Sequence, residues 1–131
     1  MIRYKEIAFT AYAVTRMARS RKFYEKILGL KPNGFSAGKM KSMWIEYDIG
    51  PGTLAIGVAE EFKPSKDGSS AALEVEDFDA AIAHLKKHRV KFVIGPKDFP
   101  KCQMVMFRDP DGNRLSLHHR KSRRDIGKTK V

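Results

Sequence analysis

Residues 107–120 read FRDPDGNRLSLHHR and predict a strand, a tight turn and a returning strand. Pro110 presets φ, Asp109 can accept hydrogen bonds from the backbone amides that follow, and Gly112 can take the left-handed geometry that closes a hairpin. These local features are sufficient to make the turn. The stretch therefore predicts a β-hairpin near the end of the chain. This prediction does not depend on whether the second strand carries functional residues.

The pattern of elements that contains this hairpin occurs twice along the chain. The second half predicts a strand, a helix and three strands, at 70–75, 78–88, 91–95, 102–107 and 113–118. The first half predicts a strand, a helix and two strands, at 7–14, 17–28, 43–49 and 53–58. A shift of 61 residues lays Val14 on Val75 and Tyr24 on Leu85. We expect an α+β fold of two tandem βαβββ modules, at about 7–58 and about 70–118, within one domain at 1–119.

One residue departs from the usual pattern at a helix end. Arg89 follows the second predicted helix, where a glycine most easily takes the left-handed conformation. An arginine that keeps this geometry costs on the order of 1 kcal/mol. The alternative is a helix that ends in a different way.

Length and composition limit the class of protein. With 131 residues and 42% hydrophobic residues, the chain can bury one substantial core. A single cysteine, Cys102, excludes an internal disulfide and fits a reducing compartment. The sequence has no signal-peptide pattern and no apolar run near the roughly 20 residues of a membrane helix. We therefore expect a cytoplasmic protein without membrane contact.

The net charge of +11 is unevenly distributed. Residues 120–131 hold six basic residues and one acid. They also lack apolar periodicity, which predicts a solvated basic C-terminal tail. A weak contact of this tail with nucleic acid is the alternative.

Three stretches together resemble one family, the glyoxalase, bleomycin-resistance and extradiol-dioxygenase (vicinal oxygen chelate) superfamily. They are AVTRMARSRKFYEKILGLKP, LEVEDFDAAIAHLKKHRV and FRDPDGNRLSL, and the resemblance extends over about residues 7–118. It implies sheets that curve into a cup, commonly completed by dimerisation, with the ligand inside. A homodimer and a small-molecule ligand are therefore expected. In metal-dependent members a divalent ion stabilises negative charge that develops on the substrate.

The same resemblance places the three usual metal ligands at Phe9, Ser70 and Ser116. A phenyl ring cannot ligate a metal, and a serine hydroxyl is a weak neutral ligand. We expect no divalent metal in the usual place and no cofactor. His84 and His88, four residues apart on the second predicted helix, are interpreted as surface histidines because no carboxylate or cysteine accompanies them at suitable spacing. Cys102 is interpreted as an inert strand cysteine.

Alternation along the strands predicts which residues line the cup. The predicted ligand-binding set is Phe9, Ala11, Ala13, Trp44, Glu46, Ser70, Ala72, Glu74, Arg114, Ser116 and His118. The sequence leaves open whether Ile45 and Tyr47 replace Trp44 and Glu46. A wall that is apolar with a few polar groups is typical of a small-molecule pocket. The candidates for proton transfer are Glu74, Glu46 and His118.

Three functions follow from these features. The first is a metal-free protein that binds a small organic molecule, neutral or anionic given the basic charge, in a β-cup at a dimer groove. The second is an enzyme of the superfamily, a lyase, isomerase or dioxygenase with a non-standard metal set. The third is a basic protein that contacts nucleic acid through its tail, although the sequence lacks aromatic–basic interleaving.

Overall fold

The structure is a computed structural model that describes residues 1–34 and 43–122. The chain divides into two compact units, Met1–Ser65 and Lys66–Val131, here called unit 1 and unit 2. Each unit is described by itself. Among the described residues, none of the helices has the length and apolar character needed to cross a membrane.

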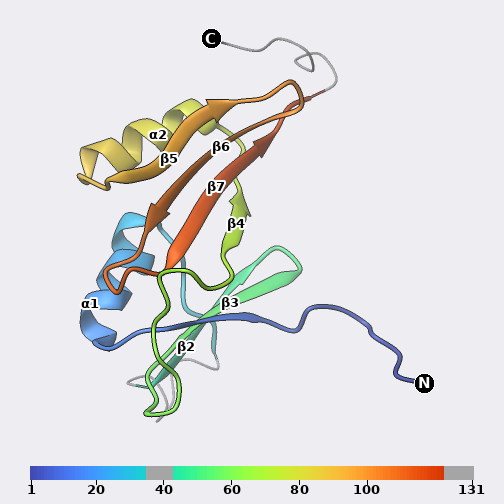
Figure 1. Cartoon of the computed structure of the whole chain (residues 1–131), viewed down its shortest axis with the longest axis vertical. Coiled ribbons are helices and arrows are strands. Elements are labelled where there is room, and N and C mark those ends of the chain that lie inside the picture. Colours follow the sequence, from blue (N-terminus) through green and yellow to red (C-terminus); the bar gives the residue numbers. More distant parts are fainter. Residues whose placement is uncertain (35–42, 123–131) are drawn as a thin grey trace. The chain divides into compact units, whose positions relative to one another are not determined.

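Unit 1 folds as a small mixed sheet with a helical segment (Figure 1). Its elements in chain order are β1 (Thr10–Ala13), α1 (Met17–Arg21), the π-helix η1 (Lys22–Ile27), β2 (Trp44–Ile49) and β3 (Gly52–Gly57). The strand order is β1-β3-β2, with β1 parallel and β2 antiparallel to β3. The predicted first strand, 7–14, is shorter than expected. Thr10 pairs with Leu54, and β3 begins at Gly52. Residues before Thr10 therefore have almost no neighbouring strand with which to pair.

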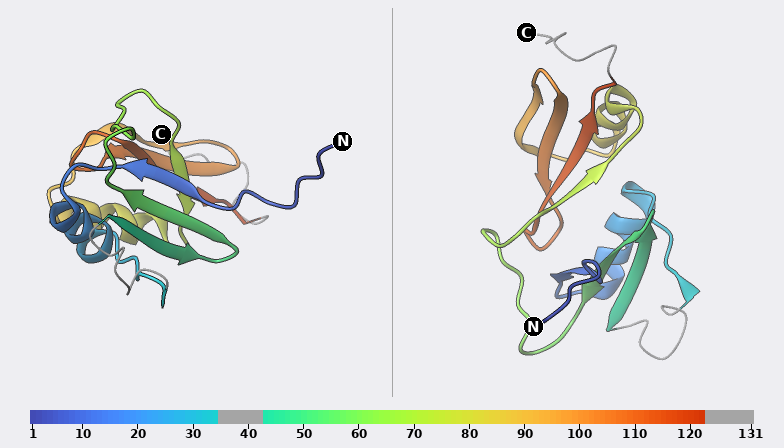
Figure 2. Two further views of the ribbon diagram at one scale, coloured as in Figure 1. Left: turned by 90° about the horizontal axis from the view of Figure 1, so that it is seen from below. Right: turned by 90° about the vertical axis from the view of Figure 1, so that its right-hand side faces the viewer.

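Unit 2 repeats this plan with a fourth strand. Its elements are β4 (Ala71–Glu74), α2 (Phe78–Lys87), β5 (Phe92–Asp98), β6 (Cys102–Arg108) and β7 (Arg114–Arg120). The strand order is β4-β7-β6-β5, with β4 parallel to β7 and the other pairs antiparallel. Helix α2 lies along one face of this sheet (Figures 1 and 2). A parallel first and last strand, joined through a helix and a meander, is common to both units.

The register confirms the internal repeat. Thr10 pairs with Leu54 in unit 1, and Ala71 pairs with Leu115 in unit 2, so both partners shift by the same 61 residues. Pro32 forms an isolated bridge to Tyr47, on the side of β2 where unit 2 has β5. The predicted α+β fold of tandem βαβββ modules is therefore confirmed, with three named strands among the described residues of unit 1.

The first helix differs from the regular helix predicted at 17–28. From Lys22 the backbone is a π-helix, and the N–H of Leu28 donates to the carbonyl of Phe23, five residues earlier. Such wide turns are rare and often lie at functional sites. Here the wide turn accompanies Glu25, whose carboxylate accepts hydrogen bonds from Arg21 Nε at 2.6 Å and Tyr47 Oη at 2.9 Å. Helical periodicity in the sequence cannot predict a tertiary contact of this kind.

Each unit buries the sheet face that meets its helix. In unit 1, Ile45, Tyr47 and Ile56 are fully buried, and the ring of Tyr47 stacks on Tyr24 of η1 with 6.1 Å between centroids. In unit 2 the equivalent buried side chains are Val105, Phe107 and Leu115 on the sheet and Leu85 on α2. Each such side chain contributes roughly 1.5–3 kcal/mol on burial. The opposite face of each sheet, here called its open face, carries partly exposed side chains, among them Trp44 and Glu46 in unit 1 and Met104 and His118 in unit 2.

The hairpin turn forms as its sequence predicts. Asp109 Oδ1 accepts hydrogen bonds from the backbone N–H groups of Asp111 and Asn113, each at 2.9 Å. Gly112 has φ +90°, the left-handed geometry for which glycine is suited. Asn113 Nδ2 also donates to Asp109 Oδ2 at 2.8 Å. Hydrogen bonds between residues of the turn therefore stabilise it.

The boundary of the predicted tail lies further along the chain than expected. Strand β7 includes Arg120, and the next residue, Lys121, is buried and forms an ion pair with Asp98 at 2.7 Å. Arg120 and Lys121, which were assigned to the tail by their charge, thus belong to the folded unit. The remainder of the predicted tail, 123–131, lies outside the described residues.

Candidate functional site: the open sheet faces

The open face of unit 1 carries an aromatic pair. Because Ile45 and Tyr47 are fully buried on the helix side, alternation places Trp44 and Glu46 on the other face. This answers the question that the sequence left open about β2. Phe9, just before β1, packs edge-on against Trp44 with 5.5 Å between ring centroids. Phe9 remains 49% exposed, so the pair leaves apolar surface open to a ligand.

The indole of Trp44 is held in place from two sides. Its Nε1 donates to Glu46 Oε2 at 2.7 Å, and a Cβ placed on Gly57 would come only 2.7 Å from the ring carbon Cε3. The ring therefore lies close over the backbone of β3, where only glycine leaves room. Sequence reasoning missed Gly57, although a glycine inside a strand often marks such a close approach. A fixed aromatic ring loses little freedom when a ligand stacks on it.

Polar side chains continue this face beyond Trp44. Asn33 Nδ2 donates to Glu46 Oε1 at 3.4 Å and to both carboxylate oxygens of Asp48 at 3.3 Å. Thr53 Oγ1 donates to Asp48 Oδ1 at 2.9 Å. These hydrogen bonds hold the carboxylates of Glu46 and Asp48 in position on this face. Sequence analysis also missed Asn33, since nothing local shows that it reaches β2.

The open face of unit 2 is built around a carboxylate–imidazole pair. Glu74 and His118 are directly opposed on the parallel strands β4 and β7, and Glu74 Oε1 lies 2.6 Å from His118 Nδ1. Glu74 Oε2 accepts a hydrogen bond of 2.6 Å from the backbone N–H of Arg120. Partial burial raises the pKa of Glu74, but the bonds from Arg120 and His118 outweigh it, so the net pKa is lowered. The carboxylate stays ionised and orients the imidazole.

The rest of this face mixes polar and sulfur-containing side chains. Arg114 forms an ion pair of 2.8 Å with Asp67, and Ser116 is buried in the middle of β7. Met104 and Met106 of β6 stand opposite His118 and Ser116. The two methionines were missed, although their alternation in CQMVMF places them on the same face.

The three positions at which the resemblance places the family's metal ligands do not suit a metal ion. Phe9 packs on Trp44, Ser70 is exposed before β4, and Ser116 is 3% exposed. None of them offers an imidazole or a carboxylate. Within residues 1–34 and 43–122, no group of three His, Cys, Asp or Glu side chains is arranged to hold a metal ion.

The remaining predicted site residues are distributed between the two units. Ala11 and Ala13 of β1 share the open face of unit 1, since Ala11 pairs with Ala55 and Ala13 with Gly57. Ala72 pairs with Ser116 on the open face of unit 2. Of the three candidates for proton transfer, Glu74 and His118 belong to unit 2 and contact each other. Glu46 belongs to unit 1, where its carboxylate contacts Trp44 and Asn33.

The histidines outside this face lie elsewhere in unit 2. His84 and His88 are exposed on α2, with 4.5 Å between ring centroids, in agreement with their interpretation as surface residues. His119, on the other face of β7, has Nδ1 2.8 Å from the carbonyl oxygen of Val75.

Comparison with known proteins agrees with the fold. Residues 6–117 match the Glyoxalase/Bleomycin resistance protein/Dioxygenase superfamily. The chain is 30% identical to the uncharacterized protein YaeR of Escherichia coli strain K12, covering 90% of this chain and 98% of that protein.

Solved structures show the same fold at lower identity. A glyoxalase/dioxygenase from Nostoc punctiforme has a TM-score of 0.75 at 19% identity, covering 90% of this chain and 92% of that one. TnmS3, an antibiotic binding protein from Streptomyces sp. CB03234, has a TM-score of 0.73 at 22% identity, covering 92% of this chain and 100% of that one. With the family match over most of its length, the chain belongs to the glyoxalase/bleomycin resistance protein/dioxygenase superfamily.

Proposed function

We propose that this protein binds a small organic molecule in a β-cup, at the groove of a homodimer and without a metal ion. The observation that carries the proposal is the Phe9–Trp44 pair, which leaves a fixed aromatic surface on an open sheet face. The donor set at the family's metal positions gives additional support, because Phe9, Ser70 and Ser116 cannot supply the usual ligands.

The chemistry of the open faces favours a planar ligand. A second ring can stack on or pack edge-on against an aromatic pair and gain about 0.5–1.5 kcal/mol beyond the area it buries. The net charge of +11 favours a neutral or anionic molecule over a cation. TnmS3, which has this fold, is an antibiotic binding protein, and this supports a binding function for the present chain.

Trp44 itself supplies the test, because it is the only tryptophan of the chain. Chelator-treated protein is titrated with a panel of neutral and anionic aromatic compounds, and the indole emission is followed. We expect at least one compound to change the emission with saturable binding and 1:1 stoichiometry. Phe9→Ala should weaken that binding, whereas Phe99→Ala, at an exposed phenylalanine of unit 2, should leave it unchanged. Binding that appears only after a divalent ion is added would contradict the metal-free proposal.

The homodimer is tested separately by light scattering. The proposal requires a particle of twice the chain mass of 14.9 kDa at micromolar concentration. A monomer that still binds the compound would refute the dimer groove and leave the binding function intact.

A second candidate function is enzymatic, and the Glu74–His118 pair favours it. A carboxylate 2.6 Å from Nδ1 orients an imidazole so that Nε2 can take up or release a proton. Any compound found to bind would be incubated with the protein and examined by mass spectrometry for conversion. Conversion that is lost in His118→Gln, with binding retained, would establish an enzyme, and an unchanged compound would refute this alternative for that ligand.

A further inference from the structure

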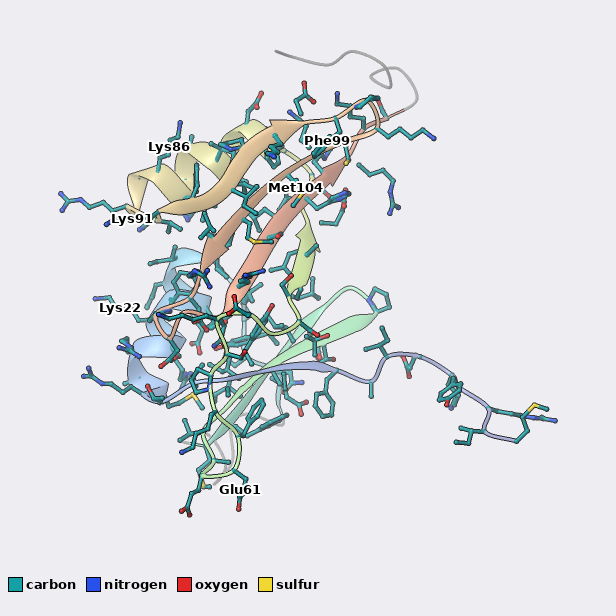
Figure 3. The ribbon with its side chains drawn as sticks, in the orientation of Figure 1. Lys22, Glu61, Lys86, Lys91, Phe99 and Met104 are labelled. Carbon is teal, nitrogen blue, oxygen red and sulfur yellow. The ribbon has the colours of Figure 1, made fainter. Side chains whose placement is uncertain are left out.

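Two thioethers and one imidazole are neighbours on the open face of unit 2. Met104 of β6 pairs directly with His118 of β7, and Met106 pairs with Ser116, the next residue of β7 on that face. Directly opposed residues of antiparallel strands have Cβ atoms about 4.5–5.5 Å apart. Figure 3 labels Met104 on β6, beside β7. Met104, Met106 and His118 are all partly exposed, so solvent reaches them.

The lengths of the side chains allow these donors to converge. Residues two apart on one strand are separated by about 6.5–7 Å. Each methionine carries its sulfur two bonds beyond Cβ on a chain with three rotatable bonds. The sulfurs of Met104 and Met106 can therefore meet at a point beside the ring of His118.

The chemistry of this donor set selects a soft ion. Thioether sulfur is a soft ligand that favours Cu(I), whereas hard divalent ions prefer carboxylate, carbonyl and water. A ligating histidine typically donates its other ring N–H to a carboxylate, which fixes the tautomer. His118 meets this requirement, because its Nδ1 lies 2.6 Å from Glu74 and Glu74 is held in turn by the N–H of Arg120. Nε2 of His118 is then the nitrogen with a lone pair for a metal.

We propose that Met104, Met106 and His118 form a binding site for a soft monovalent ion, Cu(I), with Glu74 as the residue that positions the imidazole. The site goes beyond the proposed binding of an organic molecule. It differs in ligand set and in class of ion from the divalent site of the family, whose positions are Phe9, Ser70 and Ser116 here.

Cys102 lies on the same face but is not included among the ligands. It pairs with Arg120, two residues along β6 from Met104, and its sulfur is bonded directly to Cβ. That short side chain does not reach across the distance to His118. A free thiol nevertheless binds Cu(I) by itself, so every measurement is made in a Cys102→Ser background.

The experiment is competition for Cu(I) against bicinchoninate, without oxygen and with ascorbate present. We expect the Cys102→Ser protein, with residues 1–131 intact, to withdraw one Cu(I) per chain. Adding Met104→Leu and Met106→Leu, which keep the apolar volume, should weaken the affinity by more than about tenfold. Adding Glu74→Gln instead should weaken it by about 10–100-fold, the usual effect of losing a carboxylate that orients a ligating histidine. Circular dichroism verifies that each variant is folded.

Matched controls separate this site from other donors. Met17→Leu removes a methionine of unit 1, and His84→Asn with His88→Asn removes the exposed pair on α2; both should leave the affinity unchanged. The proposal is wrong if the Cys102→Ser protein takes no Cu(I) from the chelator, or if the double leucine variant binds as tightly as its parent. The titration of Trp44 emission uses metal-free protein, so it tests binding of the organic molecule independently of Cu(I) binding. Either proposal can therefore fail without the other.

Discussion

At the scale of single residues, Glu74 joins two elements of unit 2 through its carboxylate. Its two oxygens accept from different partners, the ring of His118 and the backbone of Arg120, each at 2.6 Å. The carboxylate therefore links two strand ends and also fixes an imidazole. Its contribution to stability should depend on pH, because the pKa of Glu74 is lowered in the folded state.

The pH dependence of Glu74 has a definite sign. A carboxyl whose folded pKa lies below its unfolded value adds stability above the unfolded pKa and loses it as the pH falls through the folded pKa. We expect Glu74→Gln to be less stable than the wild type near pH 7, and the difference to shrink between about pH 5 and pH 3. Urea unfolding across that range measures it. Glu61→Gln, at an exposed residue, controls for the loss of one negative charge. A difference independent of pH would contradict the assignment.

At the scale of elements, the end of α2 carries a conformational cost. The N–H of Arg89 donates to the carbonyl of Lys86 and that of Val90 to the carbonyl of Leu85, which is the hydrogen-bond pattern of a Schellman motif. Arg89 has φ +59°, so it takes the left-handed conformation, a point that the sequence left open. Every other positive-φ residue in the described part of the chain is a glycine.

Replacing this residue by glycine should stabilise the protein. We expect Arg89→Gly to raise the free energy of unfolding by about 0.5–1 kcal/mol, because glycine takes positive φ without a steric penalty. Lys87→Gly, at the last residue of α2, is the matched control and should lower it by up to about 1 kcal/mol. Chemical denaturation of both variants decides the matter. Two destabilised variants would show that Arg89 makes contacts worth more than its strain.

The ion pair between Asp98 and Lys121 ties the end of β5 to the residue after β7. Both side chains are largely buried, with 11% and 5% exposed, and their charged atoms lie 2.7 Å apart. Lys121→Met leaves the carboxylate of Asp98 without its cation, which costs about 3–5 kcal/mol for a buried pair. Lys97→Met, at an exposed lysine of β5, should change stability by less than about 0.5 kcal/mol. Equal stabilities of the two variants, measured by thermal unfolding, would count against this role.

At the scale of the whole molecule, the position of the last folded residue affects how the tail is studied. Truncation after Ser122 keeps both the Asp98–Lys121 pair and the N–H of Arg120 on Glu74. Truncation after His119 removes both. We expect the shorter chain to be less stable than the longer one by about 3 kcal/mol or more. Similar unfolding midpoints for the two truncations would contradict the placement of Lys121 in the folded unit.

The truncation after Ser122 also tests the nucleic-acid alternative. Residues 123–131 contain four basic residues and one acid, so their removal lowers the net charge without touching the described contacts. If the tail binds nucleic acid, removing it should weaken binding to duplex DNA and reduce the salt dependence of that binding. Unchanged binding after truncation, or no binding by the untruncated chain of residues 1–131, would refute this alternative.

Much of the fold was predictable because its signals are local. The hairpin at Asp109 and Gly112 and the helix starting at Phe78 both depend on neighbouring residues and on regular periodicity. Seen in two copies, these signals also indicated the family. The open faces were predicted in part, because alternation assigns residues to a face once one buried neighbour is known. It could not choose between Trp44 and Tyr47, since both faces of β2 carry a large aromatic ring.

The sequence by itself determined the repeat and the turn chemistry, and it is the source of the prediction that Phe9, Ser70 and Ser116 stand at the family's metal-ligand positions. Only the tertiary structure decided the π-helical turn around Glu25, the placement of Trp44 over Gly57 and the meeting of Glu74 with His118 and the N–H of Arg120. The physical reason is that Glu74 and His118 are 44 residues apart and meet through the register of two parallel strands. Register is set by the packing of a whole sheet on its helix, and no local stretch of sequence carries it.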